Sequence, residues 1–113
     1  MAMDKSLLAG STALLVLKLL EDGDKYGYQM VEELRRRSDN TFELKSGTLY
    51  PLLHTLEQKG YITAWEENTD DARPRRYYHL TDSGRHQLAH KEAQWRAYAG
   101  AMHRVLEGGL CLA

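Results

Sequence analysis

The segment from about residue 4 to residue 21 is apolar on almost every side of the helix that it is expected to form. Its apolar residues are Leu7, Leu8, Ala13, Leu14, Leu15, Val16, Leu17, Leu19 and Leu20. A helix of this kind has to be covered on more than one side. Because a chain of 113 residues buries only about two-thirds of its unfolded surface, part of the cover is expected to come from a second subunit.

The composition is that of one globular domain rather than of a disordered chain or a membrane protein, with 42% hydrophobic and 27% charged residues. Lys18 interrupts the first apolar segment, which is shorter than the ~20 residues that span a bilayer. No A-x-A cleavage site follows that segment, so a secretion signal is not expected. The single cysteine, Cys111, allows no internal disulfide. These features predict a protein of the reducing cytoplasm.

Two helices are expected between residues 26 and 59. The first, at about 26–38, has one apolar face and ends in Arg35–Arg37. Cations stabilise the negative end of a helix dipole, so this triplet indicates a helix end more than a binding patch. The second, Ser46–Lys59, carries leucines at helical spacing on one face and polar residues on the other. Ser46 is expected to cap this second helix.

Two strands are expected next, at Tyr61–Glu67 and Arg75–Leu80, because both runs are rich in β-formers and the turn-forming NTDDARP joins them. Thr81-Asp82-Ser83 then caps a last helix that runs to about Glu107. The expected fold is mainly α with a small β-hairpin, in the order of a winged helix-turn-helix followed by a C-terminal helix. The expected domains are a DNA-binding winged helix-turn-helix over 1–81 and a dimerisation helix and tail over 82–113.

Three stretches, YGYQMVEEL, SGTLYPLLHTLEQKGYI and RPRRYYHLTDSGR, resemble the PadR family of bacterial transcriptional regulators, and the resemblance runs over nearly the whole chain from about Ser6. The resemblance implies a homodimer that binds an operator through its third helix and its wing. In short members of the family the last helix completes the dimer. In some of them it also helps to form a pocket for flat aromatic compounds.

The polar face of the third helix is suited to a major groove of DNA, where small polar groups and a helix N-terminus meet base edges and phosphates. The candidate contacts are Ser46, Thr48, Tyr50 and His54. This face carries no arginine, so arginine readout of guanine is not available from this helix.

The cluster RPRRYY contributes Arg73, Arg75 and Arg76 as further candidate DNA contacts. If the turn spans 68–74, Glu67 lies opposite Arg75 and Glu66 lies opposite Arg76, and cross-strand ion pairs worth only ~0.2–1 kcal/mol each could neutralise the cluster. The hairpin is then either internally paired and solvated, or a wing that contacts DNA. Its place directly after the third helix favours the wing.

The last helix has an apolar seam, which we define as Leu88, Trp95, Met102, Val105 and Leu106. The first three recur at steps of seven residues, as in a dimer interface. The seam is too short for a bare coiled coil, which needs about three to four heptads. The apolar first helix is therefore expected to cover it, from the same subunit or from the other.

Trp95 within the seam is open to two interpretations. Aromatic side chains dominate interfaces, so packing alone is one of them. The resemblance to drug-binding regulators supports the other, in which Trp95 borders a pocket with Leu7 and Leu14 as walls and Ala99 leaving space. Such a pocket would take a planar aromatic ligand, and Glu92 would favour a cationic one.

No enzyme motif such as G-x-S-x-G, a P-loop or H-E-x-x-H occurs, so neither an enzyme nor a cofactor is expected. His86 and His90 lack a third ligand at metal-site spacing and predict a solvated helix face. The balance of 15 basic and 16 acidic residues keeps open a winged helix that binds protein instead of DNA. The pattern as a whole favours a homodimeric DNA-binding regulator. We expect a repressor of an inverted-repeat operator that a small aromatic ligand releases.

Overall fold

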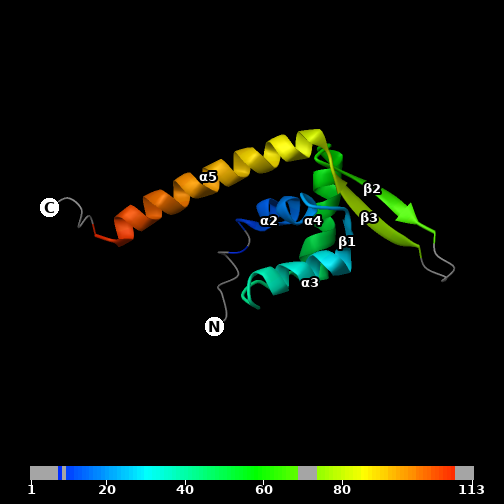
Figure 1. Cartoon of the computed structure of the whole chain (residues 1–113), viewed down its shortest axis with the longest axis horizontal. Coiled ribbons are helices and arrows are strands. Elements are labelled where there is room, and N and C mark those ends of the chain that lie inside the picture. The colour runs from blue at the N-terminus through cyan, green and yellow to red at the C-terminus, as the bar shows by residue number, and fades with distance from the viewer. Residues whose placement is uncertain (1–7, 9, 69–73, 109–113) are drawn as a thin grey trace.

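The structure is a computed structural model that describes residues 8, 10–68 and 74–108. Its elements are, in chain order, α2 (Thr12–Leu20), β1 (Lys25–Tyr26), α3 (Gly27–Arg37), α4 (Ser46–Gln58), β2 (Ile62–Glu67), β3 (Arg75–Leu80) and α5 (Asp82–Leu106). The long helix α5 projects away from the other elements, which gives the molecule extents of 66 × 32 × 21 Å (Figure 1). The expected fold, mainly helical with a small sheet in winged-helix order, is confirmed.

The core is built around α2, which α3, α4, the sheet and the first half of α5 surround. Val16 and Leu17 of α2 and Met30 of α3 are 0% exposed. The remaining buried hydrophobic residues are Leu19, Leu20, Leu34, Leu44, Leu49, Leu53, Leu56, Ile62, Tyr78, Leu80 and Leu88. The apolar sides of α2 are thus mostly buried within one chain, because helices and the sheet cover this helix from different directions.

The first helix does not run unbroken from residue 4 to residue 21 as expected. A turn at Gly10 and Ser11 precedes α2, which begins at Thr12, and the Ser11 N–H donates to the Leu8 carbonyl at 2.9 Å. Glycine and serine favour helix boundaries over helix interiors, and the leucine pattern on both sides concealed the break.

No helix of the described residues is long and apolar enough to cross a membrane.

The sheet has three strands in the order β1-β3-β2, all antiparallel, where only a two-stranded hairpin was expected. The register of the hairpin is the expected one, with Glu66 opposite Arg76 and Glu67 opposite Arg75. The added strand, β1, pairs Tyr26 with Tyr77. Two residues are too few to show the alternation by which strands are recognised, so β1 escaped prediction.

The start of α5 is fixed by Thr81, which caps the helix as expected. The Thr81 hydroxyl accepts a hydrogen bond from the Gly84 N–H at 3.0 Å. The same hydroxyl lies 2.7 Å from the Gly60 carbonyl oxygen and 3.0 Å from that of Tyr61, to which it donates. The beginning of α5 is therefore tied to the turn that ends α4.

Candidate nucleic-acid interface

The four DNA-contact candidates of α4 are all exposed, while its leucines Leu49, Leu53 and Leu56 are buried. Ser46, Tyr50 and His54 follow one another at steps of four residues and form one row, and Thr48 lies toward the other border of the exposed face. Ser46 does not cap the helix. Lys45 is the N-cap residue and Ser46 is the first residue of α4, because the extended backbone needed at a cap occurs one residue earlier.

Tyr50 packs across the start of α3. A Cβ atom at Gly27 would overlap the phenol end of Tyr50, although half of the Tyr50 side chain remains exposed. A cavity of about 510 Å³ lies beside this contact, between α3 and the beginning of α4. Besides Ser46 and Tyr50, its lining includes Tyr28 and Lys45, two exposed residues that the sequence did not single out. Both lie next to predicted DNA contacts and extend the polar face of α4.

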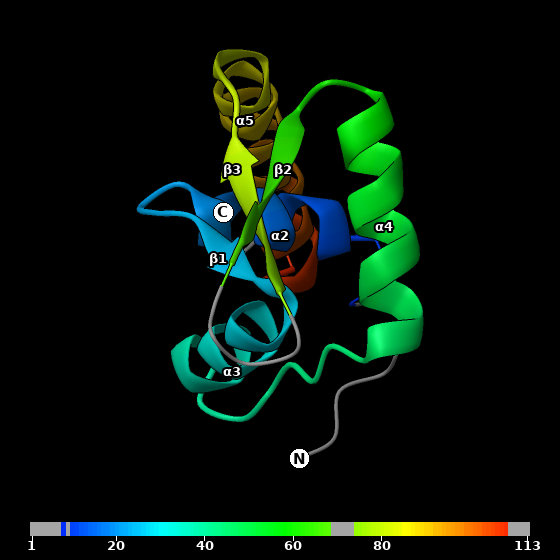
Figure 2. The same ribbon diagram turned by 90° about the vertical axis from the view of Figure 1, so that its right-hand side faces the viewer.

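The hairpin of β2 and β3, the wing, lies at the same end of the molecule as α4 (Figures 1 and 2). Arg75 and Arg76 are both exposed. The guanidinium of Arg75 lies 5.1 Å from the centre of the Tyr26 ring, as in a cation–π contact. Arg73, the third arginine of the cluster, lies outside the described residues.

The expected cross-strand ion pairs of the wing do not form within the described residues, although the register is right. The ion pair of Arg76 is instead with Glu57 of α4, at 3.3 Å. The reason is that α4 packs beside β2 and presents a carboxylate within reach of Arg76, which a pairing scheme limited to the hairpin leaves out. This ion pair links the wing to α4. Arg75 keeps its charge free of an ion pair within the described residues.

The outer face of the wing carries stacked aromatic rings. Trp65 lies parallel to Tyr77, with ring centres 4.5 Å apart and an interplanar angle of 10°. Tyr77 meets Tyr26 edge to face at 5.3 Å. Because the two large faces of Trp65 and Tyr77 cover one another, these rings stabilise the wing.

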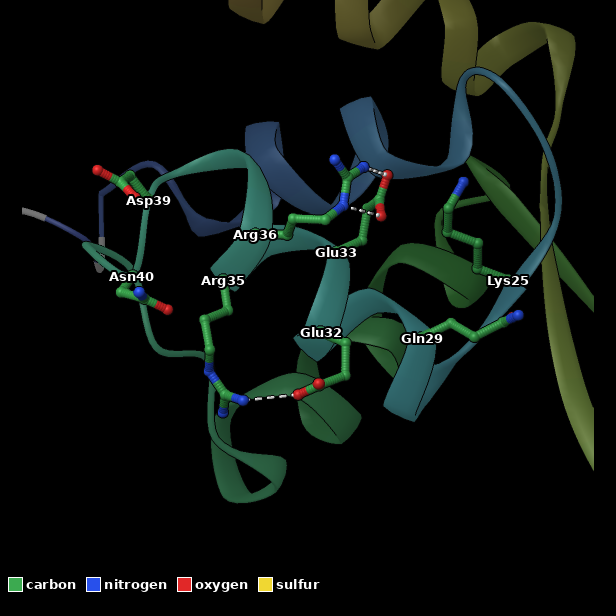
Figure 3. Close-up of a pocket in the computed structure, with 8 residues that line it drawn as sticks. All are labelled: Lys25, Gln29, Glu32, Glu33, Arg35, Arg36, Asp39 and Asn40. Atoms are coloured by element: carbon green, nitrogen blue, oxygen red, sulfur yellow. Dashed lines mark hydrogen bonds and ion pairs between the residues drawn. The ribbon is translucent and has the colours of Figure 1, made fainter.

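The arginines at the end of α3 form ion pairs with acidic residues nearby, which agrees with the prediction that they mark a helix end. Arg35 lies 2.7 Å from Glu32, and Arg36 lies 2.7 Å from Glu33 (Figure 3). Arg37 pairs with Glu33 and with Asp22. A cavity of about 610 Å³ on this surface is thus lined by charges that already neutralise one another.

A third cavity, of about 270 Å³, lies between α2 and the middle of α5. Its lining residues are Ser11, Leu14, Leu15, Lys18, Phe42, Glu92, Trp95 and Arg96. Two of the predicted pocket residues, Leu14 and Trp95, therefore meet. Ala99 is half-buried one turn further along α5 but is not among the lining residues, and Leu7 lies outside the described residues. Phe42 was not foreseen, because the loop that carries it has no helical pattern.

The charges around this cavity differ from those expected. Glu92 does not present a free negative charge, because Lys18 lies 3.4 Å and Arg96 lies 3.3 Å from its carboxylate. Lys18 also pairs with Glu21 at 2.7 Å, and this hydrogen bond is the main cause that raises the pKa of its ammonium group. Two cations therefore surround one carboxylate at the cavity. This arrangement does not favour a cationic ligand.

The apolar seam of α5 divides into a buried part and an exposed part. Leu88 is 2% exposed and belongs to the core of its own chain, so the prediction that it lies in a dimer interface is wrong. Trp95, Met102, Val105 and Leu106 are 41–76% exposed, as is Tyr98. The division arises because α2 lies against the first half of α5 and leaves the second half uncovered (Figure 1).

His86 and His90 are exposed on α5, and no group of three or more metal-ligating side chains occurs within the described ranges. The arrangement that remains is an exposed polar helix, α4, beside an arginine-bearing wing. It defines the class of winged helix-turn-helix DNA-binding proteins. Residues 16–90 match the Transcriptional regulator PadR-like family, so the chain belongs to the PadR family of transcriptional regulators.

Solved structures of similar proteins have the same fold. A PadR family transcriptional regulator from Eggerthella lenta is 33% identical with a TM-score of 0.81, covering 91% of this chain and 88% of that one. A transcriptional regulator from Clostridium thermocellum is 27% identical with a TM-score of 0.82, covering 88% and 96%. In sequence, a transcriptional regulator of Mycobacterium tuberculosis is 36% identical to this chain over 70 residues, 62% of each chain. These relatives are regulators of transcription, and the chain is a DNA-binding regulator of the same family.

Proposed function

We propose that the protein is a homodimeric repressor that binds an inverted-repeat operator and is released by a small planar aromatic ligand. The observation that carries this proposal is the separation of two surfaces. The polar face of α4 and the wing lie at one end of the molecule, and the exposed apolar part of α5 lies toward the other (Figure 1). One surface suits DNA and the other suits a second copy of the chain. Such a regulator acts in the cytoplasm, where bacterial DNA lies.

The second half of α5 supports the dimer. Trp95 and Met102 are 50% and 41% exposed, and Val105 and Leu106 are more than 70% exposed, on one helix. Helical geometry places all four within about 60° of the direction of Met102. A contiguous apolar face of this kind marks a protein interface, and the resemblance to the PadR family implies a homodimer.

The dimer determines the form of the operator. A two-fold axis relates the two copies of α4, which then meet successive major grooves about 34 Å apart. The proposed contacts are Ser46, Thr48, Tyr50 and His54 from α4, with Arg75, Arg76 and Arg73 from the wing. Side chains of α4 would read the bases, and the arginines of the wing would bind phosphates.

The cavity beside Trp95 supports the proposal of a planar aromatic ligand. Leu14, Leu15 and Phe42 provide an apolar lining next to the indole ring, and the cavity opens beside the proposed dimer face. A planar aromatic molecule could stack on Trp95 there. Ligand binding changes operator affinity if the shape of the cavity differs between the dimer conformation that fits DNA and the one that does not. A ligand with equal affinity for both conformations does not shift the equilibrium between them.

The test is selection of bound DNA from a random pool by the full chain. An inverted repeat with half-site centres roughly one helical turn apart is the expected product. The alternative function is a winged helix that binds a protein partner, which the nearly balanced charge of 15 basic and 16 acidic residues keeps open. Failure to enrich any DNA at low salt would support that alternative and contradict the proposed repressor.

A further inference from the structure

Asp24, in the turn between α2 and β1, contacts both strands of the wing. Its Oδ2 accepts a hydrogen bond from the indole Nε1–H of Trp65 in β2, at 2.8 Å. Its Oδ1 lies 2.8 Å from Nδ1 of His79 in β3. An ionised carboxylate can only accept hydrogen bonds, so Nδ1 of His79 is the donor in this contact. One side chain outside the wing thus holds both of its strands.

The carboxylate of Asp24 is ionised at neutral pH. Partial burial acts to raise its pKa, but the hydrogen bonds from His79 and Trp65 outweigh this effect and hold the pKa below its ordinary value of 3.8. Lys25 adds a smaller contribution in the same direction. The bond from Trp65 does not depend on the charge of His79, because the indole N–H carries its hydrogen at every relevant pH.

The contact reaches Arg75, one of the proposed DNA-binding arginines, through aromatic rings. Trp65 stacks on Tyr77, Tyr77 meets the edge of Tyr26, and the guanidinium of Arg75 lies over Tyr26. The centres of neighbouring rings in this group lie 4.5 Å and 5.3 Å apart. A shift of Trp65 would therefore pass through Tyr77 to the Tyr26 ring, over which Arg75 lies.

We propose that Asp24 is a positioning residue for DNA binding, which fixes the wing so that Arg75 and Arg76 hold a set place relative to α4. The inference rests on the proposed function, because it takes the wing to contact DNA. Asp24 also belongs to the turn that directly follows α2. Since α2 lines the cavity beside Trp95 through Leu14, Leu15 and Lys18, the same carboxylate joins the wing to the ligand-binding helix.

Charge alone predicts the opposite effect of removing Asp24. The substitution Asp24→Ala takes a negative charge away from the end of the molecule that faces DNA, which by electrostatics raises the affinity for DNA. A positioning role predicts that the affinity falls. The sign of the change in affinity therefore separates the two roles.

The experiment compares the full chain with Asp24→Ala, using the selected operator and fluorescence anisotropy at fixed salt. We expect Asp24→Ala to weaken binding about five- to tenfold. The matched control is Asp22→Ala, in the same turn and with the same change of charge, because Asp22 pairs with Lys25 and Arg37 and not with the wing. Asp22→Ala is expected to leave the affinity unchanged or raise it. Asp24→Asn keeps an acceptor for Trp65 and should restore most of the binding.

A spectroscopic readout tests the contact itself. The indole N–H resonance of Trp65, assigned with Trp65→Phe, should move in Asp24→Ala, while that of Trp95 should stay in place. Should Asp24→Ala not fold, Trp65→Phe removes only the donor and keeps an aromatic ring over Tyr77, and it should bind operator about two- to threefold more weakly.

Two results bear differently on the two proposals. Wild-type protein that binds no DNA overturns the proposed function, and this inference with it. Wild-type protein that binds operator, together with an Asp24→Ala variant that binds as tightly or more tightly, overturns this inference alone. An equal loss in Asp22→Ala would also overturn it, because the loss would then belong to the turn as a whole.

Discussion

Tyr50 of α4 covers Gly27, the first residue of α3, so closely that no side chain fits at residue 27 while the ring keeps its place. The contact atoms are the phenolic oxygen and the ring carbons next to it, which form the far end of a half-exposed side chain. The two helices of the helix-turn-helix therefore meet through a glycine and a residue proposed to contact DNA.

The first prediction is that Gly27→Ala weakens operator binding more than it lowers stability. The ring of Tyr50 can turn outward, so the free energy of unfolding should fall by only about 1 kcal/mol. The displaced phenol leaves its place on the DNA-facing surface, and anisotropy with operator should report the loss. In a Tyr50→Ala background the same change should have almost no further effect on binding. Additive losses would show that Gly27 acts independently of Tyr50.

The second prediction concerns Gly84, in the first turn of α5. A Cβ atom there would overlap the Tyr61 carbonyl oxygen and would lie 2.7 Å from a methyl carbon of Leu80. Because a backbone carbonyl cannot move aside as a side chain can, Gly84→Ala should lower the free energy of unfolding by about 2–3 kcal/mol, measured in urea.

The matched control for Gly84→Ala is Gly100→Ala in the same helix. A Cβ atom at Gly100 would meet only the end of Arg104, at 3.6 Å, and residue 100 lies on the side of α5 opposite to Met102. There the ordinary helix preference for alanine should raise stability by about 0.5–1 kcal/mol. A stabilising effect at both positions would contradict the close packing of Gly84 on Tyr61.

Local patterns predicted the parts of the fold that depend on neighbouring residues. The leucines of α4 recur at helical spacing, and they alone decide which face of the helix is buried. The number of residues between the two strand patterns predicted the hairpin register, and the pairing of Glu67 with Arg75 agrees with it. The threonine before α5 likewise identified the start of that helix.

Contacts between distant segments were beyond local patterns. The ion pair of Arg76 with Glu57 joins residues 19 positions apart, and the bond of Asp24 with Trp65 joins residues 41 apart. Leu88 fits a seven-residue repeat with Trp95, yet it belongs to the core. The repeat could not predict this, because it does not show which part of α5 is covered by α2. Periodicity identifies an apolar face, and the neighbouring element decides what covers it.

The third prediction is that Arg75→Ala weakens binding to all DNA sequences alike. Arg75 has no ion pair within the described residues, so its charge is available to a phosphate. Loss of one phosphate contact should make the slope of log affinity against log salt shallower by about one unit. The control is Arg104→Ala, near the far end of α5, which should leave the slope unchanged.

Thr48→Ala and His54→Ala in α4 should instead alter the preferred DNA sequence. A change of sequence preference in Arg75→Ala, or a change of salt slope alone in the two α4 variants, would contradict the assigned roles.

The fourth prediction is that Met102→Lys converts a dimer into a monomer or an insoluble protein. The change places an unpaired charge in the exposed apolar part of the seam. Sedimentation at micromolar concentration should show a stable dimer for the wild type and its loss in the variant. Ala97→Lys adds the same charge about 140° away around α5 and should remain dimeric. A wild-type monomer of normal stability would remove the basis for a symmetric operator.

The fifth prediction is that planar aromatic acids bind beside Trp95 more tightly than planar cations of similar size. The cavity has an apolar lining for a flat ring, and its charged lining residues are two cations, Lys18 and Arg96, and one carboxylate, Glu92. The second carboxylate that pairs with Lys18, that of Glu21, lies outside the lining. Titration should quench the fluorescence of a Trp65→Phe variant, in which Trp95 is the remaining tryptophan, and a Trp95→Phe variant should show no such response. Lys18→Met removes one cation while keeping a chain of similar length, so it should reduce the preference for acids several-fold without abolishing stacking. Ligands that bind with the opposite charge preference would show that the Glu92 carboxylate dominates the cavity, and ligands that bind without changing operator affinity would separate Trp95 from regulation.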